Sequence, residues 1–140
     1  MLRVDPIAKG IVLDHIQVGN GVEIFERLGL RQVDYPVALL MNVPSTKMGR
    51  KDMIKISDTL NLDLTMLGLL DPNITVVYIE GGKVTRKIKP GLPERVVDLM
   101  TCKNPRCITS SERHGLSIFE LTDRDKKEYR CFYCGERIRV

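Results

Sequence analysis

All four cysteines of this 140-residue chain lie between positions 102 and 134. They form two close pairs, Cys102 with Cys107 and Cys131 with Cys134, and 23 residues separate the pairs. Two thiolates on each of two tight turns can meet at one point, which gives the tetrahedral sulfur cage that suits Zn²⁺. Because about forty residues bury too little apolar surface to fold alone, a bound metal would supply much of the folding energy there.

Two other uses of the cysteines are weighed against zinc. Iron accepts the same four ligands, so spacing alone leaves iron open. Two disulfides are typical of small secreted domains, but the N-terminus has no basic segment followed by an apolar one, and no signal peptide is predicted. A cytoplasmic chain favours metal over disulfides. Since four cysteines leave no open position for water, the sequence predicts one structural zinc per chain and no catalytic metal.

The first ninety residues alternate between two kinds of pattern. Apolar and β-branched runs predict strands, and apolar residues at helical spacing predict helices. The expected strands are residues 11–16, 36–43, 53–56, 74–79 and 84–88, and the expected helices are residues 21–30 and 62–70. A strand–helix–strand–strand–helix–strand order is the split β-α-β arrangement of ferredoxin-like sandwiches, with one extra hairpin strand here.

The prolines and glycine of residues 90–93 indicate a boundary between two parts. We therefore predict an α+β chain in three segments. Residues 1–91 form the ferredoxin-like α/β sandwich, residues 92–100 form a linker, and residues 101–140 form a small zinc-ribbon, rubredoxin-like β domain. Short strands are expected in the last segment over residues 116–121, 128–131 and 137–140.

Composition excludes some functions and leaves one alternative open. No apolar run approaches the roughly 18 residues of a membrane helix, and the net charge of +4 does not require nucleic acid. Residues 101–140 hold 9 Lys or Arg against 6 Asp or Glu, but residues 123–128 form a run of mixed sign, as in a solvated turn. An independent zinc-ribbon nucleic-acid binder remains the alternative, and it would use Arg106, Arg113, Arg124, Lys126, Lys127, Arg130, Arg137 and Arg139.

A second polar set lies in the first part. Asp14 and His15 interrupt an apolar strand, Lys51 and Lys55 flank another, and Lys87 lies on the last hairpin strand. A carboxylate can bind ribose hydroxyls, whereas lysine and histidine can bind phosphates. Taken alone, these residues favour the structural alternatives, a hydrogen-bonded strand histidine and lysines that protect sheet edges. No phosphate-binding glycine loop and no activated nucleophile is found, so no enzyme is predicted, and a histidine-dependent hydrolase is disfavoured because His15 and His114 lie in separate domains.

Several segments resemble one family, the regulatory chain of aspartate carbamoyltransferase. They are Gly10–Ile16, Asn42–Ser45, Met48–Ile56 and Leu92–Arg95, together with both cysteine pairs. The resemblance extends from Leu2 to about Glu136. It implies a non-catalytic, cytoplasmic allosteric subunit of pyrimidine biosynthesis. It also implies that the N-terminal domain binds CTP or ATP and forms a regulatory dimer, and that the zinc domain docks on the catalytic chain, six chains of each kind assembling together.

The resemblance also assigns roles to single residues. Asp14 would hold the ribose, His15 and Lys87 the phosphates, and Lys55 the base and ribose. Backbone groups near Ile7 would recognise the base edge, which would let one pocket accept both a pyrimidine and a purine. The expected nucleotide-binding residues are Val4, Asp5, Ile7, Asp14, His15, Lys51, Lys55, Ile79, Val84 and Lys87, and the expected contacts with the catalytic chain are Asn104 and Tyr133.

Five positions depart from the family pattern. Val77 replaces an asparagine that faces the site, Gly82 a tyrosine, Ala8 a lysine, and Asp5 a glutamate, while Arg106 replaces an asparagine in the first cysteine turn. These changes support a further alternative, a homologue that retains assembly but has a weakened nucleotide response. Which nucleotide inhibits or activates does not follow from the sequence.

Overall fold

The computed structural model describes residues 4–111 and 117–140, and it divides the chain into two compact units, Met1–Gly91 and Leu92–Val140. We call these the N-terminal unit and the C-terminal unit. Arg113 and His114, and residue 116 at the start of the strand expected over 116–121, lie outside the described residues. None of the helices in the described parts of the chain is long and apolar enough to span a membrane.

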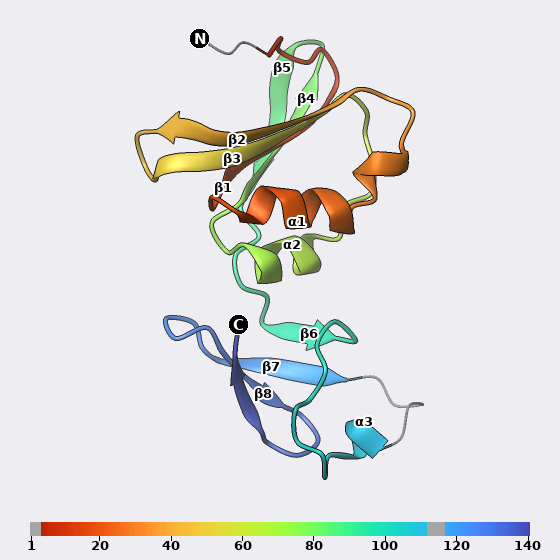
Figure 1. The fold of residues 1–140 in the computed structure, drawn as a ribbon, viewed down its shortest axis with the longest axis vertical. Coiled ribbons are helices and arrows are strands. Elements are labelled where there is room, and N and C mark those ends of the chain that lie inside the picture. Colours follow the sequence, from red (N-terminus) through yellow and green to blue (C-terminus); the bar gives the residue numbers. More distant parts are fainter. Residues whose placement is uncertain (1–3, 112–116) are drawn as a thin grey trace. The chain divides into compact units, whose positions relative to one another are not determined.

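The N-terminal unit is a five-stranded sheet with the strand order β2-β3-β1-β4-β5, and every neighbouring pair is antiparallel. Both α-helices lie on one face of this sheet (Figure 1). The elements are β1 (Gly10–Ile16), α1 (Asn20–Arg27), a 3-10 turn η1 (Leu30–Gln32), β2 (Val37–Ser45), β3 (Gly49–Ile56), α2 (Leu64–Leu70), β4 (Thr75–Glu80) and β5 (Lys83–Ile88). The predicted split β-α-β order and α+β class are confirmed.

Strand β3 shows how the sequence divides the two faces of the sheet. Successive side chains of a strand point to opposite faces. Ile54 and Ile56 are fully buried and pack with the apolar side chains under the helices, whereas Lys51 and Lys55 are only half-buried. The face without helices, which we call the open face, therefore carries charged groups that the core does not need.

Asp52 lies on the helix side of β3 and is fully buried. Its carboxylate accepts hydrogen bonds from the backbone N–H groups of Gly19 (3.1 Å), Gly21 (3.1 Å) and Asn42 (3.2 Å). Two of these donors lie at the start of α1, where N–H groups have no partner within the helix. A Cβ atom on Gly21 would lie 2.8 Å from the Asp52 side chain, so this contact needs glycine.

The C-terminal unit is a four-stranded antiparallel sheet with the order β6-β7-β8-β9. Within the part of this unit that the structure describes, few apolar side chains are fully buried, namely Val96, Phe119 and Tyr129. The elements are β6 (Arg95–Val97), α3 (Ile108–Ser111), β7 (Ile118–Asp123), β8 (Glu128–Cys131) and β9 (Arg137–Arg139). The small β domain with clustered cysteines is the predicted architecture.

Residues 92–100, which the sequence assigns to a linker, contain strand β6. Val96 in this strand is fully buried and pairs with Phe119 of β7. A strand of three residues with one inward side chain gives almost no periodic signal, so its pairing could be found only from the structure.

Candidate functional site

The four cysteines come from two separate turns, two from each, and converge on one point. The Sγ atoms of Cys102 and Cys134 are 3.5 Å apart, those of Cys107 and Cys131 are 3.7 Å apart, and all four lie within 4.8 Å of one another. A tetrahedron with Zn–S bonds of roughly 2.3 Å has sulfur atoms about 3.8 Å apart. The cage therefore fits a tetrahedral metal ion held by four thiolates.

Backbone hydrogen bonds shape the two turns that carry the cysteines. In the first turn, Cys107 N–H donates to the Asn104 carbonyl (3.0 Å), and Arg106 N–H donates to the Asn104 side chain (3.0 Å). In the second, Gly135 N–H donates to the Cys131 carbonyl (2.9 Å), and Gly135 is left-handed with φ 79°. Glycine adopts this conformation without steric cost, so it can close the turn directly after Cys134.

The four thiols differ in their electrostatic surroundings. Burial raises the pKa of Cys102 to about 12 and also raises the pKa of Cys131. The hydroxyl of Thr109, 3.0 Å from the Cys107 sulfur, lowers the pKa of Cys107 to about 6. Four thiolates therefore require a cation among them, and metal binding displaces protons. Thr109 was not predicted from the sequence, where its only signal is a hydroxyl residue two positions after a ligand.

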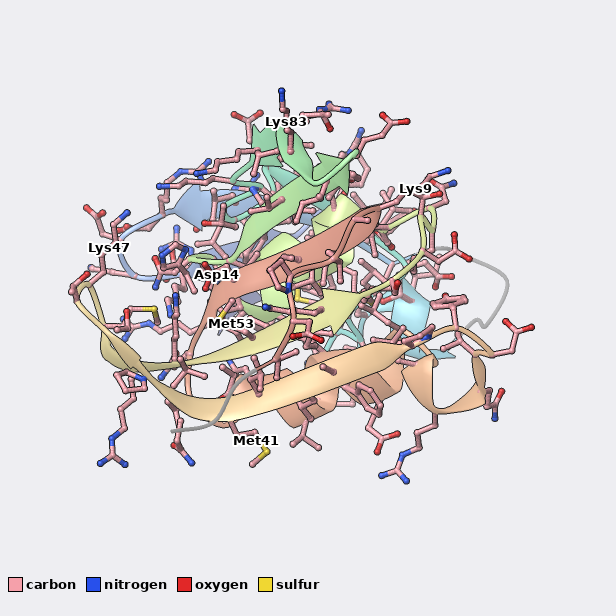
Figure 2. The ribbon with its side chains drawn as sticks, turned by 90° about the horizontal axis from the view of Figure 1, so that it is seen from above. Lys9, Asp14, Met41, Lys47, Met53 and Lys83 are labelled. Atoms are coloured by element: carbon pink, nitrogen blue, oxygen red, sulfur yellow. The ribbon has the colours of Figure 1, made fainter. Side chains whose placement is uncertain are left out.

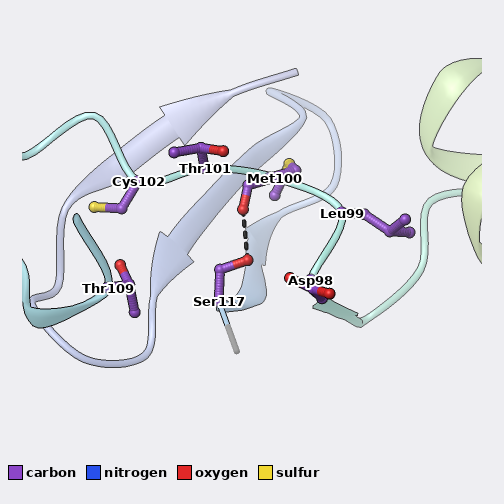
Figure 3. Close-up of a pocket in the computed structure, with 7 residues that line it drawn as sticks. All are labelled: Asp98, Leu99, Met100, Thr101, Cys102, Thr109 and Ser117. Carbon is purple, nitrogen blue, oxygen red and sulfur yellow. Dashed lines mark hydrogen bonds between the residues drawn. The ribbon is translucent and has the colours of Figure 1, made fainter. Parts of the chain in front are cut away.

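A cavity of about 270 Å³ adjoins this centre on the side of Cys102 (Figure 3). Ser117 closes part of it by donating a hydrogen bond of 2.5 Å to the Met100 carbonyl. Its walls are Asp98, Leu99, Met100, Thr101, Cys102, Thr109 and Ser117.

The two residues predicted to contact a partner lie in the cysteine turns. Asn104 is half-buried in the first turn, and Tyr133 is exposed in the second. The Tyr133 ring meets the exposed ring of Phe132 edge to face, with centroids 5.4 Å apart. The guanidinium of Arg95 lies 5.8 Å from the Phe132 centroid. The second turn thus presents two aromatic rings beside the metal ligands.

On the open face of the N-terminal unit, four strands place side chains in one row. Lys55 on β3 pairs with Val12 on β1, Val12 pairs with Val77 on β4, and Val77 pairs with Lys87 on β5. Because neighbouring strands are about 4.8 Å apart, the backbones of the two lysines are about 14 Å apart. The sheet register thus brings Lys55 and Lys87 to one face, with two valines between them.

The neighbouring pairs of residues extend this face. Asp14 pairs with Thr75, and Ile79 pairs with both Gly10 and Val84. Figure 2 looks onto this face, with Asp14 and Met53 on adjacent strands. Of the sequence-predicted residues, Asp14, Lys55, Ile79, Val84 and Lys87 thus share the same region of the sheet.

Asp14 lies at the centre of a charged cluster. Its carboxylate forms an ion pair with the Lys51 ammonium (2.9 Å) and accepts a hydrogen bond from the His15 backbone N–H (2.6 Å). Burial raises the pKa of Asp14, but the hydrogen bonds from Lys51 and His15 and their charges lower it further, so the net shift is downward. Asp14 is therefore an anion that is partly neutralised by Lys51.

His15 has a left-handed backbone (φ 57°) where the pairing of β1 with β3 is interrupted. Its Nδ1 atom is hydrogen-bonded to the Thr75 hydroxyl, 3.1 Å away. The ring borders a cavity of about 280 Å³, which is lined by His15, Lys47, Met48, Asn73, Thr75 and Lys89. The sequence analysis missed Thr75, Lys47 and Lys89, because only the fold brings a hairpin turn and the end of β5 next to His15.

The N-terminal arm, residues 4–8, lines a different cavity of about 380 Å³. Val4, Asp5 and Ile7 meet Lys55 there, and the Lys55 ammonium donates a hydrogen bond of 3.4 Å to the Val4 carbonyl. The Gly82 N–H of the β4–β5 turn donates to the Ala8 carbonyl (2.8 Å), which fixes the end of the arm. The predicted nucleotide-binding residues thus form neighbouring groups on one unit, and the arm group and the His15 group border separate cavities.

Comparison with known proteins identifies both units. A family model described as the allosteric domain of the aspartate carbamoyltransferase regulatory chain matches residues 2–91, and one described as its metal binding domain matches residues 94–140. The chain belongs to this family. The resemblance found in the sequence is confirmed, and the match to a metal binding domain together with the four clustered cysteines is consistent with one structural zinc.

Curated regulatory chains cover the whole sequence. The chain of Clostridium tetani is 49% identical over 141 aligned positions, which cover 100% of this chain and 98% of that protein. The chain of Clostridium acetobutylicum is 47% identical over 97% of this chain and 93% of its own length. The chain of Bifidobacterium longum is 37% identical over 99% of this chain and 100% of its own length.

Proposed function

We propose that this regulatory chain is a non-catalytic subunit that binds a nucleoside triphosphate, CTP or ATP, on the open face of its N-terminal unit. The observation that carries the proposal is the row of Lys55 and Lys87 across four strands, next to the Asp14–Lys51–His15 cluster. The names of the relatives, all regulatory chains, support the non-catalytic role.

The chemistry of this face suits a nucleotide. Lysine ammonium groups and an imidazole form charge-assisted hydrogen bonds with phosphate oxygens. The Asp14 carboxylate accepts hydrogen bonds from ribose hydroxyls, and the Lys51 ammonium reduces the repulsion between this carboxylate and the phosphates. Backbone groups of the N-terminal arm, beside Lys55, recognise a base edge without an aromatic platform. Backbone recognition of this kind accommodates both a purine and a pyrimidine.

Two departures from the family pattern support the alternative function, a regulatory chain with a weakened nucleotide response. Val77 lies between Val12 and Lys87 in the row and offers no hydrogen-bonding side chain. Gly82 is left-handed (φ 75°) in the β4–β5 turn and has no side chain, and no described atom beyond its chain neighbours lies within 4 Å of where a Cβ atom would be, so the turn offers no aromatic wall at this position. An effector changes activity only if it binds two states with different affinity, and fewer contacts leave less room for such a difference.

For the C-terminal unit we propose docking on the catalytic chain, with the zinc ion as the structural support of the docking surface. The exposed rings of Phe132 and Tyr133 beside the metal ligands support this role, because aromatic side chains are enriched at interface centres. A cytoplasmic location, a regulatory dimer and an assembly with six catalytic chains complete the proposal. A site of four cysteine ligands requires reduced thiols, which a reducing compartment maintains.

Calorimetry with CTP and with ATP on the zinc-loaded chain tests nucleotide binding. We expect saturable, micromolar binding and a loss of about 10–100-fold in affinity for Lys87→Ala, because one hydrogen bond to a charged group contributes roughly 1.5–3 kcal/mol. Lys83→Ala is the matched control: it removes an equal charge from the start of the same strand, where Lys83 pairs with Glu80. Absence of binding to the folded wild-type chain would favour the assembly-only alternative, and equal affinity of both variants would place the phosphates elsewhere.

A further inference from the structure

The two units meet in the sequence at Pro90-Gly91-Leu92-Pro93, and the first half of this segment is fixed to the N-terminal unit. A Cβ atom on Gly68, within helix α2, would lie 2.0 Å from the Gly91 carbonyl oxygen and 3.3 Å from the Pro90 Cβ atom. Glycine is unfavourable inside a helix, second only to proline. The close packing of Pro90 and Gly91 against α2 explains why residue 68 has no side chain.

The second half is fixed to the C-terminal unit by hydrogen bonds to three successive carbonyl groups. The Arg124 guanidinium donates to the Leu92 carbonyl (2.8 Å), and the Tyr129 hydroxyl donates to the Pro93 carbonyl (2.5 Å). The Leu121 N–H donates to the Glu94 carbonyl (2.8 Å), directly before β6 begins. Because Tyr129 is fully buried in β8, this anchor is part of the core of the unit.

Few backbone rotations remain between the two anchors. The rings of Pro90 and Pro93 fix their φ angles, and the ψ angle of Leu92 is restricted to extended values because Leu92 precedes a proline. Gly91 is left-handed with φ 64°, a conformation that glycine adopts freely. We infer that the peptide between Gly91 and Leu92 is the hinge of the chain, so that movement of one unit relative to the other occurs by rotation about ψ of Gly91 and φ of Leu92.

A hinge of one peptide has a consequence for regulation, and this consequence rests on the proposed function. Hinges are a few residues that absorb the change in φ and ψ between two states. A movement started by a nucleotide in the N-terminal unit passes to the metal-binding unit through this peptide. A longer, flexible connection would let the units move independently, and the effect would be lost.

The test measures the distribution of distances between the units in the full, zinc-loaded chain. Nitroxide labels on p-acetylphenylalanine at positions 23 and 139 leave the metal cysteines untouched, and dilution with unlabelled chain isolates distances within one chain. Gly-Ser inserted between Gly91 and Leu92 should broaden the distribution markedly, and Tyr129→Phe should broaden it by releasing Pro93. The same insertion after the exposed Asn61, in the loop between β3 and α2, should leave it unchanged.

A wild-type distribution as broad as that of the hinge insertion, or an insertion without effect, would overturn the inference. In the assembly with catalytic chains, the hinge insertion should keep nucleotide affinity and lose the effect of nucleotide on activity. If the wild-type chain binds no nucleotide, the proposed function fails, while the distance distributions still decide whether the hinge exists.

Discussion

The two units of this chain are stabilised in different ways. The N-terminal unit packs ten buried apolar side chains between one face of its sheet and two helices. Among its described residues, the C-terminal unit has three fully buried apolar side chains, Val96, Phe119 and Tyr129, and the other buried groups there include three of the four cysteines. The first unit therefore has its own hydrophobic core, whereas the second depends on a metal to complete its core.

The same difference separates function from stability. In the N-terminal unit, the candidate ligands Lys55 and Lys87 lie on the open face and do not contribute to the core. In the C-terminal unit, three of the four functional cysteines are buried and form part of the core. Substitutions of Lys55 or Lys87 can therefore remove nucleotide binding without unfolding the N-terminal unit. Substitutions of the metal ligands cannot remove metal binding without also unfolding the C-terminal unit.

The largest expected effect is the loss of a metal ligand. Cys131→Ser should abolish stoichiometric zinc binding and unfold the C-terminal unit, since structural zinc contributes about 10–16 kcal/mol in comparable small sites. The N-terminal unit should stay folded because its core contains no cysteine. Zinc analysis combined with NMR of both units checks this, and zinc added back to the chelated wild-type chain should restore its signals. Dispersed signals from β7–β9 without bound zinc would contradict the metal-dependent core.

Truncation of a core side chain in the N-terminal unit should destabilise that unit and leave the C-terminal unit unaffected. Ile54→Ala removes a fully buried side chain from the helix face of β3 and should lower the free energy of unfolding of the N-terminal unit by about 2–5 kcal/mol. Zinc content and the C-terminal signals should not change. Met53→Ala truncates the neighbouring residue, which lies on the open face, and it should lower the free energy of unfolding in urea denaturation by roughly 1 kcal/mol or less. Equal losses for both variants would show that the two faces are not divided as described.

The next effect tests the hydroxyl group beside the metal ligand. Thr109→Val keeps the shape of the side chain but removes the donor to the Cys107 sulfur, and it should weaken zinc binding by roughly 10–100-fold. Thr101→Val, at an exposed threonine adjacent to Cys102, is the control and should keep wild-type affinity. Competition with a chromophoric chelator measures both. Identical affinities would mean that the Cys107 thiolate does not need this hydrogen bond.

The sequence predicted the cysteine centre and the order of the main elements because both follow from local patterns. Two spaced cysteine pairs indicate a metal cage wherever the connecting residues lie, and alternating apolar runs indicate strands and helices. The row from Lys55 to Lys87 could not be predicted in this way, because it depends on the register of three strand pairs. Strand β6 could not be predicted either, because only one of its residues points inward. The contact of Thr75 with His15 was equally unpredictable, because it depends on the irregularity in strand β1.

The smallest expected effect concerns the Asp14–Lys51 ion pair. Asp14 has a pKa below its ordinary value of 3.8, so its anion stabilises the fold above that pH, and this contribution is lost as the pH falls through the lowered pKa. Lys51→Met removes the main group that opposes the effect of burial on the Asp14 carboxyl, so the pKa of Asp14 should rise.

The free energy of unfolding should fall by about 1 kcal/mol or less near pH 7 in this variant, because both side chains of the ion pair are partly exposed. This loss should shrink as the pH falls through 3.8 towards the lowered pKa of Asp14 in the wild-type chain, where the carboxylate becomes protonated. NMR titration of the Asp14 carboxyl carbon, with urea denaturation of the N-terminal unit at several pH values, measures both effects, and Lys83→Met should show neither. An unchanged titration midpoint in Lys51→Met would mean that the backbone N–H of His15, and not the ammonium, keeps Asp14 ionised.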